Sequence, residues 1–497
     1  MNLVALCTLQ TLLTFHVATP EPVRFGVPLP HKGVARGLRL EDLEGARLQW
    51  RLLQERPDPV HGTVWVELLV AGGSGSGRIC AGGMGPAPEG GPLCRIETVE
   101  QLTPQGVQLR TERWHHACGR SEERTHRLFL RATEHEGEHY RAGEALLDED
   151  ADWLRRWQAV ALPRSTWERA GLLPPDSGLA ARHRTELLAA AEALVELPGR
   201  RGAGDYGRSG GIVTNLEYDT ALAFLRLHFA TGDPAHLVRA WRSARHVLDR
   251  DLDRHSGLPH AHGRDHRSAR PEPGHAWLRG MLWSGLAAGD DQLVAGARAM
   301  AHALAAHPPD GEGEQDRARD HAWPLGELET WLSFADDPAC ALAADQLADA
   351  IVHRFDPALD MLRFGESAVE GPMPLERAWI TGGIVLPALR MHLVRNPRES
   401  VARVVQRLER ALVEQLLRGE PGLPILWHAS ERGPCGVHRA LADPRGWLML
   451  EGLSLPDLRR VLGRAAIRKG LGELPQATDP DLATTFSMLA RTRWIWR

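Results

Sequence analysis

Asn215-Leu-Glu-Tyr-Asp219 opens a stretch of helical periodicity that runs to a sharp acidic break at Thr231-Gly-Asp233. The same order of features, a polar and aromatic opening, one helix and an acidic break, occurs twice more along the chain. The further copies are Gly274-His-Ala-Trp277 with Ala288-Gly-Asp290, and Asp320-His-Ala-Trp323 with Ala335-Asp-Asp337. Repeats of this kind are typical of stacked helical hairpins. We therefore predict an (α/α) toroid whose inner helices surround a central cleft, with an open α-solenoid as the alternative.

Helical periodicity extends through the whole chain after about residue 150. The expected helices are 179–197, 215–230, 234–252, 275–288, 291–306, 321–335, 338–355, 375–394, 398–417 and 456–469. Short breaks rich in Gly, Asp and Pro join most of these segments, which favours antiparallel neighbours. We expect almost only helix in this part of the chain.

Before that point the periodicity is that of β-strands. The expected strands include 11–17, 22–30, 46–53, 62–70, 106–110 and 126–131. Short alternating runs bounded by Gly and Pro are typical of a β-sandwich, and the Gly/Pro-rich stretch 72–92 is expected to be a long surface loop. The predicted fold class is multidomain α+β, with a β-sandwich domain over 1–145 and an (α/α)6-type toroid over 146–497.

Composition excludes several classes of function. The 497 residues carry a net charge of -5, so we expect no nucleic-acid partner. No apolar run approaches the roughly 18 residues that a membrane span needs, and we expect no membrane partner. The six cysteines form no C-x-x-C pair, which argues against a zinc ribbon. Residues 1–17 are apolar but lack a basic start and a clean cleavage site, so a first strand and a cytoplasmic location are favoured over a signal peptide and secretion.

A first group of candidate functional residues surrounds the opening of the first repeat. The glycine-rich loop 204–211 contains Tyr206 and Arg208, and Asn215, Glu217, Tyr218 and Asp219 follow it. Such a loop before a helix offers main-chain N–H groups and a positive dipole end to an anionic ligand. Helix capping by Thr214 or Asn215 is the simpler interpretation, but it does not account for two of the three tyrosines in the chain.

A second group follows between residues 253 and 277, where five of the 24 histidines fall. These are His255, His260, His262, His266 and His275, accompanied by Arg264 and Trp277. His321 and Trp323 open the third repeat and are expected to approach the same mouth. Histidine suits general acid–base chemistry and metal binding, but His260 and His262 lack a third ligand at a clear spacing. We therefore predict no metal ligands and no cofactor, with a divalent cation such as calcium as the alternative and solvated loop histidines as the simplest interpretation.

The same residues carry a family resemblance. Arg24-Phe-Gly-Val-Pro-Leu-Pro30, with Pro57-Asp58 and Thr63-Val-Trp65, resembles the N-terminal β-sandwich of the exo-rhamnogalacturonan lyase-like family. The segments that resemble its toroid are Asn215–Asp219, Thr231–Asp233, Gly257–His260, His262–His266 and Glu272–His275. The resemblance covers roughly residues 20–340 and implies a polysaccharide lyase acting on uronate-containing, rhamnogalacturonan-like oligosaccharides. Family members carry a further C-terminal β domain, whereas helical patterning is expected here nearly to Arg497.

A lyase of this class requires three groups, which the two clusters offer. The C6 carboxylate is neutralised, a base removes the C5 proton, and an acid protonates O4. The predicted catalytic residues are His260 and His262 as the base and Tyr206 and Tyr218 as the acid. The predicted substrate-binding residues are Arg208, Asn215, Glu217, Asp219, Arg264, His266, His275, Trp277, His321 and Trp323. The alternatives are a glycoside hydrolase with paired carboxylates among Glu217, Asp219, Asp265 and Glu272, and a non-catalytic sugar-binding protein.

Overall fold

The computed structural model describes residues 11–18, 23–54, 56–71, 73–81, 94–102, 107–116, 121–129, 160–176, 185, 187–192, 218–253, 256–260, 273–307, 318–363, 375–417, 423–430, 433–440 and 448–463. The chain divides into two compact units. Unit 1 comprises Met1–Pro175, Phe224–Arg250 and Leu282–Val294, and unit 2 comprises Asp176–Ala223, Asp251–Met281 and Ala295–Arg497. Each unit is therefore built from three separate stretches of sequence.

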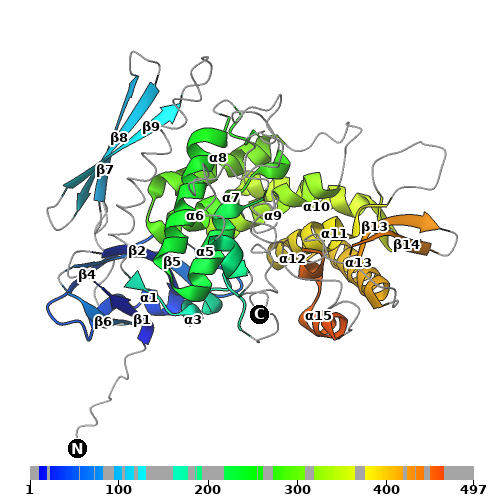
Figure 1. The fold of residues 1–497 in the computed structure, drawn as a ribbon, viewed down its shortest axis with the longest axis horizontal. Coiled ribbons are helices and arrows are strands. Elements are labelled where there is room, and N and C mark those ends of the chain that lie inside the picture. The colour runs from blue at the N-terminus through cyan, green and yellow to red at the C-terminus, as the bar shows by residue number, and fades with distance from the viewer. Residues whose placement is uncertain are drawn as a thin grey trace, which may run out of the picture. The chain divides into compact units, whose positions relative to one another are not determined.

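Small antiparallel sheets precede the helical region (Figure 1). The first sheet has the order β10-β1-β6-β3, with β1 at Thr11–Val17, β3 at Leu38–Glu41, β6 at Gly75–Ala81 and β10 at Val160–Ala161. The second has the order β2-β5-β4, with β2 at Val23–Pro30, β4 at Arg47–Leu52 and β5 at Thr63–Ala71. The third has the order β7-β8-β9, with β7 at Cys94–Leu102, β8 at Val107–His116 and β9 at Ser121–Phe129. The predicted first strand, 11–17, is thus confirmed.

Strand β2 presents its two faces to different neighbours within unit 1. Phe25 lies beside Phe15 of β1, with ring centroids 5.9 Å apart, so the first two sheets share apolar contacts on that side. At the next residue, Gly26, an added Cβ would lie 1.7 Å from the carbonyl oxygen of Leu286 in α7 (Leu278–Ala288). Successive residues of a strand face opposite sides of a sheet. The second sheet is therefore covered by β1 on one side and by helical backbone on the other.

An ion-pair group lies on the helical side of the second sheet. Glu67 is paired with Gly26 across the strands and is fully buried. Its carboxylate binds Arg51 of β4, which also donates to both oxygens of Asp291 at 2.8 and 2.9 Å. Asp291 is the first residue of α8 (Asp291–Ala306). The buried carboxylate thus has the charged partner that its burial requires.

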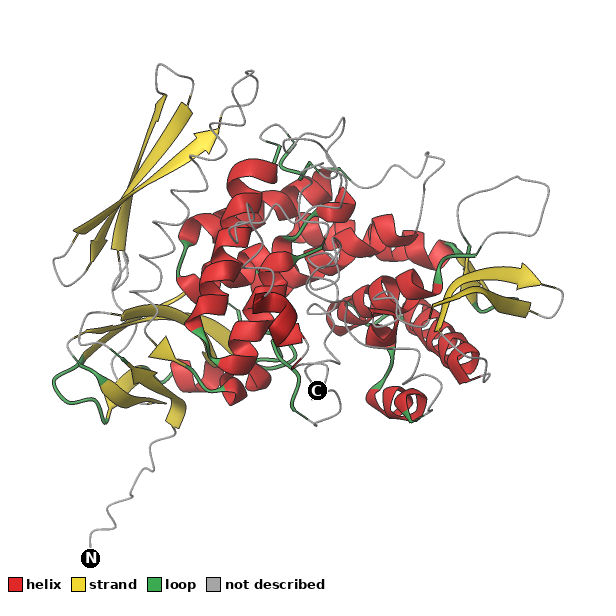
Figure 2. Cartoon of the chain, viewed as in Figure 1, coloured by secondary structure: helices red, strands yellow, loops and turns green. Residues whose placement is uncertain are grey.

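Helices make up most of the described residues after 163 (Figure 2). Besides α7 and α8 they are α3 (Arg164–Arg169), α5 (Thr220–Thr231), α6 (Pro234–His246), η1 (Val247–Asp251), η3 (Pro273–His275), α9 (Ala318–Phe334), α10 (Pro338–His353), α11 (Ala378–Ile380), η4 (Thr381–Val385), α12 (Leu386–Arg395), α13 (Glu399–Leu417), η5 (Leu450–Gly452) and α15 (Leu455–Leu462). One short helix, α1 (His31–Val34), lies earlier in the chain, among the strands. The expected helices at 291–306 and 398–417 agree closely with α8 and α13.

The acidic breaks of the repeat are helix caps. Asp233 accepts a hydrogen bond from the Ala235 N–H at the start of α6, and Asp290 accepts one from the Gln292 N–H at the start of α8. Asp337 does the same for the Cys340 N–H of α10. An Asp at this position satisfies N–H groups that have no partner inside the helix. Each copy of the repeat therefore contains a turn between two helices, and an Asp at the end of that turn caps the second helix.

Alternate helices lie side by side in unit 2. Helix α9 packs against α10 and also against α12, while α13 packs against α10 and α12. This places α9 and α12 in one layer and α10 and α13 in another, as expected for stacked helical hairpins. Closure of the layers into a six-hairpin ring stays a prediction.

Two expectations about strands are wrong. The stretch 72–92 was expected to be a loop, but its described part contains β6, which pairs with both β1 and β3. The part after 150 was expected to be almost entirely helical, but it contains the hairpin of β13 (Leu423–Ser430) and β14 (Gly433–Ala440). Between 215 and 420 the only described strands are β11 (Phe355–Asp356) and β12 (Met361–Leu362), which leaves the hairpin arrangement intact. None of the helices in the described ranges is both long and apolar enough to cross a membrane.

Candidate functional site

Four side chains from the openings of the three repeats pack together in unit 2. Tyr218 lies just before α5, His275 and Trp277 lie just before α7, and Trp323 lies in the second turn of α9. The Tyr218 and Trp277 rings are stacked, with centroids 6.2 Å apart and planes 24° apart. Trp323 meets both edge-on, at 6.4 and 5.4 Å, and His275 meets Trp277 edge-on at 5.9 Å. We call these four residues the aromatic cluster.

The aromatic cluster is buried, and its rings contact one another. Trp277 is 3% exposed, Trp323 6% and Tyr218 9%. Aromatic pairs in such geometries contribute about 0.5–1.5 kcal/mol beyond their buried area. The contacts therefore fix the position of Tyr218, the cluster residue that carries a phenol. Residues 201–217 lead directly into Tyr218, and 261–272 lie between His260 and the turn that carries His275, so the predicted loops adjoin this cluster in sequence.

The Pro-Gly-His opening of α7 lies against the opening of α9. Pro273–His275 form a single 3-10 turn. A Cβ added to Gly274 would lie 3.6 Å from the Asp320 carboxylate and 4.0 Å from the Trp323 ring. The opening of α7 thus packs at ordinary contact distance from the opening of α9, and Trp277 contacts Trp323.

Asp219 was predicted to bind substrate, but both of its carboxylate oxygens accept main-chain hydrogen bonds. One oxygen caps α5 through the Leu222 N–H at 2.9 Å, and the other accepts from the Gly280 N–H of α7, also at 2.9 Å. Asp219 is fully buried. A carboxylate at a helix N-terminus is stabilised by the unpaired N–H groups and the helix dipole. Asp219 thus joins two helix openings, and we leave it out of the proposed site.

Two further acidic residues perform the same task, and sequence reasoning missed both. Glu327 of α9 accepts from the Arg279 N–H at the start of α7, at 2.7 Å. Glu376 accepts from the Ala318 N–H at the start of α9, at 2.9 Å. Burial raises the pKa of Glu376, although hydrogen bonds from the Arg377 and Ala318 N–H groups oppose that shift. Buried carboxylates therefore join the starts of α5, α7 and α9, so the residues that open these helices are held at fixed positions.

His260 ends a tight turn that begins at Asp251. The His260 N–H donates to the Asp251 carbonyl, and Gly257 adopts a φ of 73° that favours glycine. One Asp253 oxygen accepts from the N–H and hydroxyl of Ser256, both at 2.8 Å, and the other lies 3.5 Å from His260 Nε2. The side chain of His260 is buried. The structure thus gives His260 an acidic neighbour, and the Asp-x-x-Ser-Gly pattern is a turn signal that could have identified it.

Of the predicted site residues not yet discussed, the structure describes only His321. His321 lies in the first turn of α9 and is 5% exposed. The candidates outside the described residues are Tyr206, Arg208, Asn215, Glu217, His262, Arg264 and His266. Trp331 of α9 and Trp379 of α11 are buried, at 1% and 4% exposure.

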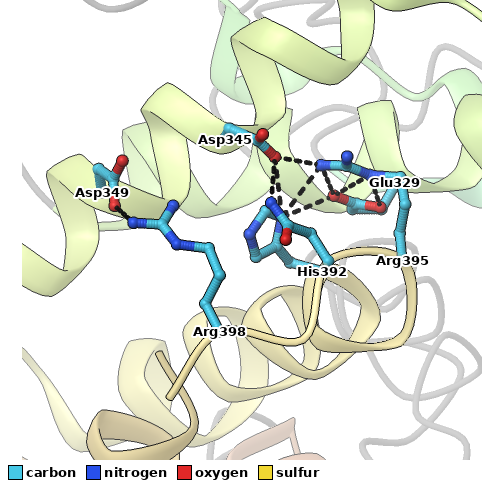
Figure 3. Close-up of polar contacts among 7 residues, drawn as sticks. Glu329, Asp345, Asp349, His392, Arg395 and Arg398 are labelled. Atoms are coloured by element: carbon cyan, nitrogen blue, oxygen red, sulfur yellow. Dashed lines mark hydrogen bonds and ion pairs between the residues drawn. The ribbon is translucent and has the colours of Figure 1, made fainter. Parts of the chain in front are cut away.

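A second buried polar group, the Glu329 network, joins α9, α10 and α12 (Figure 3). His392 Nδ1 lies 2.8 Å from a Glu329 oxygen, and Arg395 donates to both Glu329 oxygens at 2.9 and 3.0 Å. Arg395 also reaches Asp345 at 2.6 Å. Burial favours a raised pKa for Asp345, but hydrogen bonds from Arg395 and Asn396 outweigh it and lower the pKa. His392 is fully buried, so a substrate does not reach it in this conformation, and the network joins three helices.

Comparison with known proteins finds likeness in structure alone. No family model matches the sequence, and a search of curated proteins gives no significant match. Among solved structures, cellobiose 2-epimerase from Bacillus thermoamylovorans has a TM-score of 0.43 at 10% identity, covering 60% of this chain and 86% of that chain.

Two other solved structures are similar at the same level. A family 76 glycoside hydrolase from a bovine Bacteroides thetaiotaomicron strain has a TM-score of 0.40 at 10% identity, covering 97% of this chain and 98% of that chain. A polysaccharide lyase has a TM-score of 0.39 at 13% identity, covering 62% of this chain and 98% of that chain. At these scores the likeness is a partial overlap of folds.

Proposed function

We propose that this protein is a carbohydrate-active enzyme, and that it cleaves uronate-containing oligosaccharides by β-elimination. The observation that supports this most is the aromatic cluster, in which the Tyr218 ring contacts two tryptophans and His275 contacts one of them, Trp277. Flat apolar rings next to hydroxyl and imidazole groups suit a sugar, whose faces are apolar and whose rim is polar. The family resemblance of the same segments, noted from the sequence, favours a uronate as the sugar.

The chemistry assigns one step to each kind of residue. Arg208, Arg264 or Asn215 neutralises the C6 carboxylate, which makes the C5 proton more acidic. The base takes that proton, the C5–H electron pair becomes the C4=C5 double bond, and the C4–O4 bond breaks. The phenol of Tyr218 or Tyr206 gives its proton to O4, which leaves as a hydroxyl.

Asp253 supports His260 as the base. A carboxylate near Nε2 favours the tautomer that carries its proton on that nitrogen, and we assign the role of accepting the C5 proton to Nδ1. The negative charge also stabilises the imidazolium that forms when the base is protonated. His262 remains the alternative base, and it lies outside the described residues.

A glycoside hydrolase with the Glu217 and Asp219 pair is less well supported. Such an enzyme needs two carboxyl groups that can reach the glycosidic bond. Both oxygens of Asp219 accept main-chain N–H groups, and the residue is fully buried. A hydrolase would therefore require other acidic residues, such as Asp265 or Glu272.

The test is a screen of uronic-acid polysaccharides read by the ultraviolet absorbance of unsaturated uronate ends. We expect absorbance to rise with one polymer class, and to rise roughly 10²–10⁴-fold more slowly in His260→Ala, the usual loss for a positioned base. New reducing ends without absorbance would indicate a hydrolase, and binding without turnover a sugar-binding protein. Full turnover in both His260→Ala and His262→Ala would overturn the histidine mechanism.

A further inference from the structure

Three side chains of different chemistry meet between α8 and α10 in unit 2. His302 projects from α8, Asp337 caps α10, and Cys340 lies in the first turn of α10. His302 Nε2 is 2.7 Å from an Asp337 oxygen. One ligand atom of each residue, the imidazole nitrogen, a carboxylate oxygen and the thiol sulfur, lies within 4.8 Å of the other two.

The surrounding structure orients these groups. One Asp337 oxygen accepts from the Cys340 N–H at 3.1 Å, which fixes the cap. The other accepts from Trp331 Nε1 at 3.2 Å as well as contacting His302. Hydrogen bonds from neighbouring groups are the usual means by which proteins orient a ligating carboxylate. Asp337 is thus held on two sides, while one of its oxygens faces the imidazole.

The three groups differ in their access to solvent. Cys340 is fully buried, whereas the His302 side chain is 56% exposed. An ion can therefore approach from the histidine side and meet the sulfur at the inner end of the group. Three protein ligands would leave the fourth position of a tetrahedral zinc ion to water.

We propose that His302, Asp337 and Cys340 bind a thiophilic divalent cation, with zinc as the metal that fits best. Nitrogen, oxygen and sulfur ligands together are characteristic of zinc sites, while calcium and magnesium take oxygen ligands. Zinc bonds of about 2.0–2.3 Å place neighbouring ligand atoms about 3–4 Å apart, and the three ligand atoms here lie within 4.8 Å of one another. The 2.7 Å contact between His302 and Asp337 has to open when the ion binds.

Binding requires a defined proton balance. Burial, followed by the nearby Asp337 charge, raises the pKa of Cys340 to about 12, so without a cation it is a thiol. Burial favours a raised pKa for Asp337, but the hydrogen bonds from Cys340, His302 and Trp331 outweigh it and lower the pKa to about 2. The cation binds the carboxylate, the neutral imidazole and the thiolate, and one proton leaves the thiol for water. The dipositive ion then balances one carboxylate and one thiolate.

The experiment is a cobalt(II) titration of the full chain, followed by zinc displacement. Thiolate bound to cobalt gives a charge-transfer band in the near ultraviolet, which carboxylate and imidazole sites lack. We expect this band in the wild type, and its loss on adding zinc. Cys340→Ala should abolish it, and His302→Gln, at an exposed position, should weaken cobalt affinity by at least the roughly 10–100-fold that loss of an outer-shell partner causes.

The matched control is Cys80→Ala. Cys80 is also buried, and its sulfur lies 3.3 Å from a Glu41 oxygen, but no His, Cys, Asp or Glu group of metal-binding geometry surrounds it within the described residues. Its replacement should leave the band unchanged. The proposal fails if the wild type shows no band in excess cobalt, or if the band persists in Cys340→Ala. Far-ultraviolet circular dichroism confirms that each variant is folded.

Discussion

Tyr218 is the residue at which the proposed chemistry can be separated from the packing of the site. Its ring stacks on Trp277, and only the phenolic oxygen is available to protonate O4. Tyr218→Phe keeps the ring contacts and removes that oxygen. We expect kcat on a uronate substrate to fall roughly 10²–10⁴-fold with little change in KM. The free energy of unfolding should change by less than about 1.5 kcal/mol, because only one hydroxyl is lost.

The control for this prediction is Tyr140→Phe, which removes the phenol of the tyrosine that belongs to neither predicted cluster. It should retain full kcat in the same absorbance assay. Unchanged kcat in Tyr218→Phe would transfer the acid role to Tyr206. Equal losses in both variants would show that the assay reports folding and not proton donation.

At single residues, sequence reasoning finds groups that act locally and misses those whose partners are distant. Tyr218, His275 and Trp277 stand out because aromatic and imidazole groups gather at repeated helix openings. The role of Asp219 depends on the Gly280 N–H, 61 positions along the chain, so the sequence offers no sign of it. An added Cβ at Gly280 would lie 2.0 Å from the Asp219 carboxylate, a spatial requirement that only the fold reveals.

At the scale of elements, the Glu329 network and a neighbouring ion pair provide a matched comparison (Figure 3). Glu329→Ala leaves the buried His392 and the Arg395 guanidinium without their shared carboxylate. We expect the free energy of unfolding to fall by roughly 3–5 kcal/mol, the usual effect of breaking a buried pair. Arg398→Ala breaks the ion pair between Arg398, just before α13, and Asp349 of α10, where the side chains are 32% and 53% exposed. That loss should be about 0–1 kcal/mol.

Urea unfolding of both variants measures the two values. If the two variants lose similar free energies of unfolding, the Glu329 network contributes no more than an exposed ion pair. A small loss in Glu329→Ala alone would mean that water enters and replaces the carboxylate.

Helix α5 contains a second element-scale prediction, on pH. Burial lowers the pKa of His228 from 6.5 to about 4, opposed by the hydrogen bond to the Asp233 carbonyl. Between these values the unfolded chain binds a proton that the folded chain does not. Stability is therefore complete above pH 6.5 and declines as pH falls toward 4, by about 3 kcal/mol for a shift of this size.

His228→Gln should remove this dependence. The variant is less stable at neutral pH, because a buried ring that contacts Trp167 and Phe229 is lost. Its free energy of unfolding, measured in urea between pH 7 and 4, should nevertheless fall less steeply with acidity than that of the wild type. The difference between the two slopes should correspond to at most one proton bound on unfolding. Identical slopes in the two proteins would show that His228 is protonated in the folded state.

The elements themselves differ in how far sequence predicts them. The helices follow from an apolar period and from Asp or Pro at their starts, both of which act within a few residues. Strand β6 lacks such a signal because its Gly-Ser-Gly start reads as a loop. At Gly77, a Cβ would lie 2.8 Å from the Phe15 ring, so the glycine is needed for packing against β1. Strands β13 and β14 contain prolines and are identified by their pairing with each other.

At the scale of the whole molecule, the contacts within unit 1 link strands to helices. Gly26 of β2 contacts the Leu286 backbone, and Arg51 of β4 binds Asp291. The adjacent Asp290 accepts from Trp241 Nε1 of α6 at 2.8 Å. A chain of contacts therefore runs from the second sheet through the α7–α8 turn to α6. We expect the sheet and these helical segments to unfold together, although they lie far apart in sequence.

Gly26→Ala tests this coupling, because its Cβ would overlap the Leu286 carbonyl oxygen at 1.7 Å. The strand and helix must separate, at a cost of about 1–3 kcal/mol or more. Hydrogen exchange should then accelerate in β2 and β5 and also in Leu282–Val294 and α6. Gly62→Ala is the control: its φ of 61° makes alanine strained, by about 1–2 kcal/mol, but no atom lies within 4 Å of the added Cβ. Its global loss is therefore similar, while no strand–helix contact is pushed apart. Faster exchange confined to the strands in Gly26→Ala would mean that the sheet opens alone, because cooperative unfolding exposes every segment that shares the core.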